Sequence, residues 1–377
     1  MKKVLQISNY YTPHIGGIES TCQYLSEGLK DEYEVRVICF SEDKSNKYEE
    51  TNDIKVFKAG VLLNIARQGL SLSYYQMLKE QMKWKPDIIH FHYPNPFVAA
   101  LLIPLIPQNT KLYLHWHLDI TKQKKIYPFI KPIETRLLKR ANIIAATSPT
   151  YRDASKPLIP FLSKTQILPS AIDLSKLDLR PDDKPIINKI KNHANGKKIV
   201  FYVGRHVPHK GVSILIEAEP MIDNNCIIYI GGQGPITEEI KAKCQSKRVV
   251  FLGRLSEQEM RCYYHMADVF AFPSYTKAEA FGLTLAEAMY CNAVPVTFNI
   301  PGSGVNWVCL NNQTGLEVEN LNTKAYAEAI NRLLTDDKLR LTLAQNGKKR
   351  VIDNFTINKE VELLKQQYKT LFQDKES

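Results

Sequence analysis

The chain of 377 residues is longer than one hydrophobic core ordinarily serves, so its length predicts about two domains. Its composition, 44% hydrophobic, 24% charged and 10% aromatic with 17 Gly and 20 Pro, excludes a disordered, collagenous or coiled-coil chain. The 50 Lys and Arg against 39 Asp and Glu give a formal net charge of +11. This charge favours an anionic partner: nucleic acid, an anionic membrane face or phosphorylated small molecules.

The seven cysteines are scattered, odd in number and form no Cys-x-x-Cys pair. Such usage favours a reducing cytoplasm over secretion and argues against a zinc site. The apolar run after Lys2 and Lys3 is too short for a signal peptide. No stretch reaches the roughly 18 apolar residues of a membrane-spanning helix. We therefore expect a protein that is soluble or lies on a membrane surface.

In chain order, the first half alternates short apolar runs with segments of helical period. The predicted strands are 4–8, 35–40, 54–58, 87–92, 111–117 and 142–147, and the clearest helices are 17–30 and 127–140. This alternation is typical of an α/β fold with a parallel sheet covered by helices. A proline-rich and then polar stretch follows, and we interpret residues 171–197 as an interdomain link.

The same alternation of strands and helices begins again with a predicted strand at 198–204. Further strands are predicted at 227–231, 249–252, 269–272 and 294–298, and helices at 212–221, 237–243, 257–266, 283–290, 323–334, 338–354 and 359–372. The pattern therefore predicts two Rossmann-like domains, 1–170 and 198–355. Because ligands of open α/β sheets bind at the carboxyl ends of the strands, functional residues are expected in the loops after them.

The loop after the first predicted strand contains Tyr10 and the glycine pair Gly16-Gly17. Paired glycines let backbone N–H groups approach a phosphate at a helix N-terminus. The spacing is not Gly-x-Gly-x-x-Gly, so dinucleotide binding is not favoured, and a simple turn is the alternative.

Two further loops carry candidate phosphate ligands. In residues 204–211, GRHVPHKG, Arg205 and Lys210 flank a tight turn where two cations can clamp a diphosphate, with a solvated basic loop as the alternative. In residues 279–288, EAFGLTLAEA, a helix opens near Phe281 with its N–H groups exposed to an anion. Glu287 lies four residues after Leu283 and leans back toward that helix end, where it can reach a ribose.

Histidines end two neighbouring strands, as His90-Phe91-His92 and as His115-Trp116-His117-Leu118-Asp119. Their position at the carboxyl end of central strands favours a functional role over a purely structural one. We do not expect a metal site, because histidines at alternate positions also arise in strands without metal.

Glu279 and Glu287 form an E-x7-E pair, and together with GRHVPHKG and Gly16-Gly17-Ile18-Glu19 they resemble the retaining glycosyltransferases of family four, which have the GT-B fold. The resemblance implies that the second domain binds a nucleotide sugar. The implied donor ligands are Arg205 and Lys210 with the N–H groups of Phe281, Gly282, Leu283 and Thr284 for the diphosphate, Glu287 for the ribose, Glu279 for the sugar, Gly16 and Gly17 from the other domain, and Gly232, Arg254 and Leu255 near the base.

His117 matches the family's histidine that contacts the donor sugar near the anomeric centre. The resemblance thus implies a catalytic set of Glu279, His117, Arg205 and Lys210, and an acceptor side with Tyr10, His115 and Asp119. It also implies that a helix over 356–377 returns to the first domain. There is no Asp-x-Asp motif to hold a metal on the diphosphate, so no metal or other cofactor is expected. One departure is Pro169-Ser170-Ala171-Ile172-Asp173, where relatives often carry Pro-Asn-Gly-Ile-Asp.

The implied activity is transfer of a hexose from a nucleotide sugar to a glycan or polyprenyl-linked acceptor in cell-surface polysaccharide synthesis. Similarity to bacterial exopolysaccharide and O-antigen mannosyltransferases favours GDP-mannose, with a UDP-hexose or UDP-N-acetylhexosamine as the alternative. Other classes left open are a GT-B epimerase or phosphorylase and a non-catalytic nucleotide-binding partner.

A basic and aromatic segment over 121–140 suits an anionic bilayer, or else forms a solvated helix face. We therefore expect a cytoplasmic protein held peripherally at the inner membrane face, and no nucleic-acid partner, since no binding module is recognisable. The basic residues of the segment are Lys122, Lys124, Lys125, Lys131, Arg136, Lys139 and Arg140.

Overall fold

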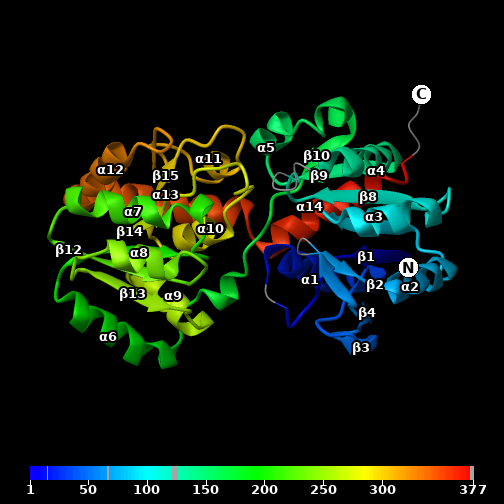
Figure 1. Cartoon of the computed structure of the whole chain (residues 1–377), viewed down its shortest axis with the longest axis horizontal. Coiled ribbons are helices and arrows are strands. Elements are labelled where there is room, and N and C mark those ends of the chain that lie inside the picture. The colour runs from blue at the N-terminus through cyan, green and yellow to red at the C-terminus, as the bar shows by residue number, and fades with distance from the viewer. Residues whose placement is uncertain (15, 66–67, 121–125, 374–377) are drawn as a thin grey trace. The chain divides into compact units, whose positions relative to one another are not determined.

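The computed structural model describes residues 1–14, 16–65, 68–120 and 126–373 (Figure 1). The chain divides into two compact units: Met1–Ala171 with Ile357–Ser377, and Ile172–Thr356. Each unit is built on its own mainly parallel sheet with helices between the strands. The predicted class, two parallel-sheet α/β domains, is confirmed.

The first unit has an eight-stranded sheet in the order β10-β9-β8-β7-β1-β2-β4-β3. All neighbours are parallel except β3, which runs antiparallel to β4 at one edge. The strands are β1 (Lys2–Ile7), β2 (Tyr33–Phe40), β3 (Lys47–Thr51), β4 (Ile54–Ala59), β7 (Ile88–Tyr93), β8 (Lys111–Trp116), β9 (Ile143–Ala146) and β10 (Thr165–Ile167), with a separate hairpin of β5 (Leu63–Ile65) and β6 (Gln68–Leu70).

Helices α1 and α14 pack against each other in this unit, although they lie at opposite ends of the sequence (Figure 1). Their apolar residues share one core with the sheet, for example Leu25 of α1 and Leu364 of α14. The final helix is thus part of the first unit. The helices of the unit are α1 (Gly17–Leu29), α2 (Leu72–Lys83), α3 (Pro96–Leu102), α4 (Tyr127–Arg140), α5 (Pro149–Ala154) and α14 (Ile357–Thr370).

The second unit has a six-stranded parallel sheet in the order β13-β12-β11-β14-β15-β16. Its central strands are buried on both faces, as parallel strands covered by helices should be. The strands are β11 (Lys198–Val203), β12 (Cys226–Gly231), β13 (Val249–Gly253), β14 (Val269–Phe272), β15 (Val294–Phe298) and β16 (Leu316–Val318). The helices are α6 (Lys184–Ala194), α7 (Val212–Ala218), α8 (Thr237–Lys243), α9 (Glu257–Met266), α10 (Leu283–Tyr290), α11 (Val305–Val308), α12 (Thr323–Thr335) and α13 (Asp337–Asn354).

The segment predicted as a link, 171–197, is largely ordered and lies within the second unit. Its helix α6 packs against α9, and Ile190 and Ala194 are buried in the core of that unit. The polar character of the segment belongs to the exposed face of α6, while one apolar stripe is buried. Pro181 and Pro185 lie in the first turns of two helices, a position that favours proline, and not in an extended linker.

A buried ion pair fastens the start of α6 to α9. Asp183 is fully buried and accepts hydrogen bonds from Arg261 Nε at 2.7 Å and Arg261 Nη2 at 2.6 Å. The Arg261 side chain holds the pKa of Asp183 below its usual value. Since the folded-state pKa is lowered, this stabilisation is present above the unfolded pKa of about 3.9. It is lost as the pH falls through the folded-state value.

Asp183→Asn should therefore destabilise the protein at neutral pH by about 3–5 kcal/mol, because it leaves the Arg261 charge buried and unpaired. The loss should shrink as the pH falls below about 4, the pKa of this carboxyl in the unfolded chain, toward the lowered folded-state pKa at which the wild-type carboxylate itself protonates. Denaturant unfolding of the wild type and of Asp183→Asn at a series of pH values measures this difference in the free energy of unfolding. A destabilisation that stays constant down to acid pH would show that the ion pair does not carry the effect.

Both sheets have a switch point at which the strand order reverses. In the first unit it falls between β1 and β7, and in the second between β11 and β14. Loops leaving neighbouring strands to opposite faces of a sheet leave a crevice between them, which is where open α/β sheets bind ligands. The loops predicted to be functional, after β1, β11 and β14, all begin at these points.

Candidate functional site

The loops after β11 and β14 meet in an ion pair between Lys210 and Glu279. Lys210 ends a short 3₁₀ helix, Pro208–Lys210, and its Nζ bonds to Glu279 Oε2. Ser274 Oγ donates to the same carboxylate oxygen at 3.2 Å, and the Glu279 side chain is only 12% exposed. The backbones also join, since Tyr275 N donates to His209 O at 3.3 Å. Two residues predicted for catalysis are thus brought together within the second unit.

Gly211 makes this approach of the two loops feasible. Its φ is +69°, in the left-handed region that favours glycine, and a Cβ there would lie 1.9 Å from the carbonyl oxygen of Pro273. Lys210 is therefore placed by a backbone contact that tolerates no side chain.

The start of α10 presents free backbone N–H groups. Gly282 precedes the helix with φ +92°, and its carbonyl accepts from Leu285 N at 3.0 Å, which closes the first turn. The N–H groups of four consecutive residues donate no hydrogen bond to any part of the chain that the structure describes: Phe281, Gly282, Leu283 and Thr284. Because such groups carry the positive end of the helix dipole, they favour an anion.

Glu287 lies one turn further along α10. Tyr264 OH donates to its Oε2 at 2.8 Å, and burial raises the pKa of Glu287 against the opposing effect of that hydrogen bond. The hydrogen bond holds the carboxylate on the face of α10 toward α9, and the predicted contact of Glu287 with a ribose stays a prediction.

Arg205 is exposed at the carboxyl end of β11, and its guanidinium makes no ion pair within residues 1–14, 16–65, 68–120 and 126–373. A cation with no internal partner remains available to an anionic ligand, and guanidinium can bind phosphate through two parallel hydrogen bonds. Lys210 differs, since it is already paired with Glu279.

A cavity of about 630 Å³ opens at the carboxyl ends of β12 and β13. Gly232 lines it together with Gly253, but Arg254 and Leu255, which follow directly, do not. Its wall includes His206, whose Nε2 donates to Gly231 O at 3.3 Å and whose Nδ1 bonds to Thr237 Oγ1 at 3.0 Å. Its volume falls within the range of small-molecule sites, and the predicted binding of the base here stays a prediction. The remaining lining residues are Gln233, Gly234, Pro235, Thr237, Glu238, Lys241, Phe251 and Leu252.

In the first unit, Gly16 caps the start of α1 and Gly17 is its first residue. The Glu19 carboxylate folds back over this helix end, so that a Cβ on Gly16 would lie 2.2 Å from Glu19 Oε2. Burial raises the pKa of Glu19, and its own backbone N–H opposes that shift. Tyr10 stacks on His14 with ring centroids 4.3 Å apart. An anion at this helix end must therefore share it with a carboxylate, a feature that the glycine pair alone does not indicate.

The two histidines of β7, His115 of β8 and His117 directly after β8 form one buried cluster. The rings of His115 and His117 stack with centroids 4.0 Å apart, and those of His90 and His92 with centroids 4.5 Å apart. His115 is fully buried, so we expect it to act through its neighbours rather than on an acceptor directly. His117 follows β8 and is 5% exposed.

Asp119 holds the loop after β8 in place. Its Oδ1 accepts from Trp116 Nε1 at 2.9 Å and from Ser155 Oγ at 2.6 Å, and its N–H donates to Tyr151 OH at 2.6 Å. These bonds give Asp119 a structural role, and its predicted contact with an acceptor stays a prediction. Lys122, Lys124 and Lys125 lie outside the described residues.

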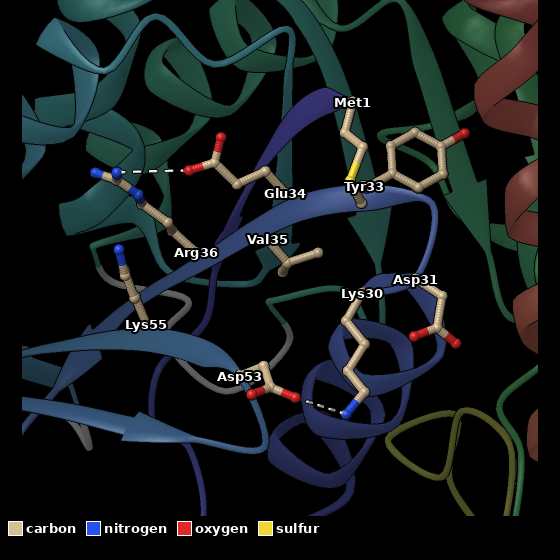
Figure 2. A pocket seen from close by; sticks show the side chains of 9 residues that line it. All are labelled: Met1, Lys30, Asp31, Tyr33, Glu34, Val35, Arg36, Asp53 and Lys55. Carbon is tan, nitrogen blue, oxygen red and sulfur yellow. Dashed lines mark hydrogen bonds and ion pairs between the residues drawn. The ribbon is translucent and has the colours of Figure 1, made fainter.

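A second hollow, of about 330 Å³, lies at the amino ends of β2 and β4 in the first unit (Figure 2). Four of its charged side chains form two pairs: Arg36 Nη2 lies 3.7 Å from Glu34 Oε1, and Lys30 Nζ lies 3.4 Å from Asp53 Oδ2. Because ligands of parallel sheets bind at the carboxyl ends of the strands, we do not assign a substrate site here.

Sequence reasoning missed several residues that hold the predicted ones. Ser274 and Ser303 bond to Glu279, through its carboxylate and its backbone carbonyl respectively. Tyr264 orients Glu287 from α9, and Gln6 of β1 bonds to His92. Only Ser274 carried a signal, since it directly ends the strand-like run before Glu279; the others are distant in sequence.

Residues 15–176 match the family model described as Glycosyltransferase Family 4, and residues 183–350 match the one described as Glycosyl transferases group 1. Together the two matches extend over both units, and the chain belongs to these glycosyltransferases. The resemblance drawn from the E-x7-E pair and the two loops is thereby confirmed.

Among characterised relatives, the chain is similar to O-antigen chain mannosyltransferase C of Escherichia coli, at 27% identity over 99% of this chain and 100% of the relative. It is also similar to D-rhamnosyltransferase WbpZ of Pseudomonas aeruginosa, at 26% identity over 92% of this chain and 90% of the relative.

Two solved structures have the same fold. Sucrose-phosphate synthase from Thermosynechococcus elongatus matches with a TM-score of 0.78 and 20% identity, over 99% of both chains. HepE of Anabaena in complex with UDP matches with a TM-score of 0.79 and 18% identity, over 98% of this chain and 100% of the other. The expected GT-B fold is confirmed. None of the helices among the described residues is long and apolar enough to cross a bilayer.

Proposed function

We propose that the protein transfers a hexose, with mannose from GDP-mannose favoured, to a glycan or polyprenyl-linked glycan of a cell-surface polysaccharide. The observation that carries the proposal is the anion cradle at the start of α10, four free N–H groups beside the Lys210–Glu279 pair. A nucleotide sugar is the donor that such a site suits, because its diphosphate leaves as an anion. The relative named as an O-antigen chain mannosyltransferase supports mannose and this class of acceptor.

In the proposed reaction, the bond between the anomeric carbon and the diphosphate oxygen breaks, and its electron pair stays on the departing diphosphate. The free N–H groups of α10, with Arg205 and Lys210, stabilise that charge from fixed positions. The acceptor hydroxyl attacks from the face that the diphosphate leaves, and its proton passes to a diphosphate oxygen. Configuration is retained without a covalent intermediate, in contrast to retaining glycosidases, whose two carboxyl groups lie about 5 Å apart.

A UDP-hexose is the second candidate donor, favoured by the structural similarity to HepE with UDP. Uracil and guanine differ in size and in their hydrogen-bonding edges, and the cavity at Gly232 is lined by polar side chains, such as Gln233, Glu238 and Lys241, that can bond to either base. The nature of the base is therefore left to the assay, whereas the phosphate ligands are the same for both donors.

The test uses the full chain with GDP-mannose, UDP-hexoses and a polyprenyl-diphosphate-linked glycan acceptor. We expect mannose transfer that continues in excess chelator, and NMR of the product should show an α linkage formed from the α-linked donor. A β linkage would contradict retention, and loss of transfer with chelator would contradict metal independence. Turnover of a UDP sugar alone would select the second donor.

The exposed face of α4 supports peripheral contact with an anionic membrane as part of this function. Phe129 is 79% exposed and shares one helix face with Arg136 and Lys139, since the three are spaced by seven and three residues. The opposite face, with Ile130, is buried in the first unit. An exposed aromatic residue beside cations suits the boundary between headgroups and acyl chains.

Phe129→Glu should weaken binding to vesicles of anionic phosphatidylglycerol. Burying a Phe side chain contributes about 1.5–3 kcal/mol, so we expect the apparent affinity to fall about tenfold or more. Cosedimentation with vesicles measures it. Leu341→Glu, at an exposed leucine of α13, is the matched control and should bind as wild type does. If Phe129→Glu bound the vesicles as tightly as Leu341→Glu does, the exposed face of α4 would be a solvated helix face with no role at a membrane.

A further inference from the structure

A chain of hydrogen bonds crosses three neighbouring strands behind His117. Gln6 lies on β1, His92 on β7 and His117 directly after β8, and these strands are adjacent in the order β8-β7-β1. Gln6 Oε1 lies 2.9 Å from His92 Nε2, and His92 Nδ1 lies 3.0 Å from His117 Nε2. Gln6 and His92 are fully buried.

These two hydrogen bonds must run in the same direction, because a neutral imidazole offers one donor and one acceptor. Burial lowers the pKa of His92 well below its usual value, and it lowers the pKa of His117 to about 3, so both rings are neutral at physiological pH. The Gln6 amide oxygen only accepts, which requires the proton of His92 to be on Nε2. His92 Nδ1 is then an acceptor, and His117 must donate to it from Nε2.

The fixed direction determines what His117 presents to a ligand. With its proton on Nε2, its Nδ1 carries a lone pair and accepts a hydrogen bond. Within the described part of the chain, no residue bonds to His117 Nδ1. A lone pair at this position can accept from a sugar hydroxyl, whereas the opposite tautomer would offer an N–H to the same hydroxyl.

We propose that Gln6 and His92 are positioning residues, which hold His117 in the Nε2-protonated tautomer so that its Nδ1 accepts a hydrogen bond from a sugar hydroxyl. The role of His117 at the sugar rests on the proposed function, whereas the tautomer itself does not. Neither Gln6 nor His92 touches substrate in this account. They act only through the ring of His117.

The same histidines have a second interpretation, as metal ligands. Nitrogens of His90, His92 and His115 lie within 4.8 Å of one another. In the structure, however, these rings bond to other groups: His90 to Tyr368 OH at 2.7 Å and to His115 Nδ1 at 3.2 Å, and His92 to Gln6 and His117. A metal would have to displace several of these bonds, which favours the hydrogen-bonded arrangement.

The amide orientation of Gln6 is the point that an experiment must decide. Gln6 Nε2 is buried and has no hydrogen-bond partner. If the amide were rotated by half a turn, Gln6 would donate to His92. The ring protons of His92 and His117 would then each move to the other nitrogen of their ring. His117 would then be protonated on Nδ1. The two arrangements therefore differ in an observable property of the wild-type protein.

The experiment is ¹⁵N NMR of the full chain with labelled histidine, made without substrate. We expect the His117 signals, assigned by their loss in His117→Ala, to show a protonated Nε2 and an unprotonated Nδ1. Gln6→Met removes the acceptor and should give a mixture of tautomers. Gln367→Met, at a buried glutamine that bonds to Tyr113 instead, is the control and should leave the His117 signals unchanged.

Turnover supplies the second measurement. In Gln6→Met we expect kcat to fall about tenfold to a hundredfold, as when outer hydrogen-bond partners of an active-site ligand are removed, with KM for the donor changed less. His92→Leu should act in the same way, and His92→Asn, which keeps an acceptor near the Nδ1 position, should recover most of the rate. In the His117→Ala background, Gln6→Met should have no further effect.

A wild-type His117 protonated on Nδ1 would overturn the proposal, and so would a metal bound at one equivalent per chain and held by these rings. Equal kcat in Gln6→Met and wild type, together with a changed tautomer, would overturn the role at the sugar. Failure of the proposed function is distinguishable, because it would leave the NMR result intact while no donor is turned over.

Discussion

Lys210→Ala and Glu279→Ala are each expected to lower transfer about 10²-fold to 10³-fold while the second unit stays folded. Lys210 is a fixed cation beside the free N–H groups of α10, and Glu279 holds it in place through their ion pair. Removing one preorganised group that stabilises developing charge costs about 10²–10³ in kcat. The loss should appear in kcat and in kcat/KM alike, because the leaving diphosphate carries more charge in the transition state than in the bound donor.

The chain offers a matched control for this pair. Lys243 and Glu239 form an ion pair at 2.7 Å on the exposed face of α8, in the same unit. Lys243→Ala and Glu239→Ala remove the same side chains away from the site and should retain wild-type turnover, because exposed pairs contribute about 0–1 kcal/mol. Near-normal turnover in Lys210→Ala or Glu279→Ala, at a thermal stability equal to that of the controls, would contradict the site assignment.

Gly211→Ala is expected to reduce both stability and turnover. The left-handed backbone at φ +69° costs a non-glycine residue about 1–2 kcal/mol. The added Cβ would also lie 1.9 Å from Pro273 O, so the loops after β11 and β14 must move apart. Since Lys210 precedes Gly211, that movement should separate Lys210 from Glu279 and lower kcat.

Gly196→Ala separates the two contributions. Gly196 has φ +77° and no atom within 4 Å of an added Cβ, so its replacement costs only the backbone strain. This cost corresponds to about 2–8 °C in Tm for a unit of this size. Gly211→Ala should lower Tm further and should also lose transfer, which Gly196→Ala should keep. Equal Tm and equal turnover in the two variants would show that the close contact with Pro273 is not needed to position Lys210 beside Glu279.

Local patterns were sufficient for much of the second unit. The helices predicted at 237–243, 257–266 and 283–290 and the strands at 269–272 and 294–298 have the predicted bounds. These segments combine a regular apolar period with clear helix starts, such as Ser256, whose side chain caps α9. The loops between them carry the E-x7-E pair and the basic turn, so the candidate donor residues could be read from the sequence.

Where long-range contacts decide the structure, the sequence was a poorer guide. The sequence predicts a link where α6 lies, because the buried stripe of that helix is narrow. It predicts no strand at β3, because an edge strand of charged residues has no apolar pattern. The hydrogen bonds that join Gln6, His92 and His117 depend on the register of β1, β7 and β8. This register brings Gln6 beside His90 and His92 beside His115. No local pattern encodes that register.

The central claim is that the start of α10, with Arg205 and Lys210, binds the diphosphate of a nucleotide sugar. Titration calorimetry of the full chain with GDP, UDP and ADP, repeated with Lys210→Ala, tests it most directly. We predict that one nucleoside diphosphate, GDP if the donor is GDP-mannose, binds at one site per chain and that Lys210→Ala weakens it strongly. Selective binding of UDP would keep the site and change the donor. Binding of no nucleotide, or binding that Lys210→Ala leaves unchanged, would contradict the account.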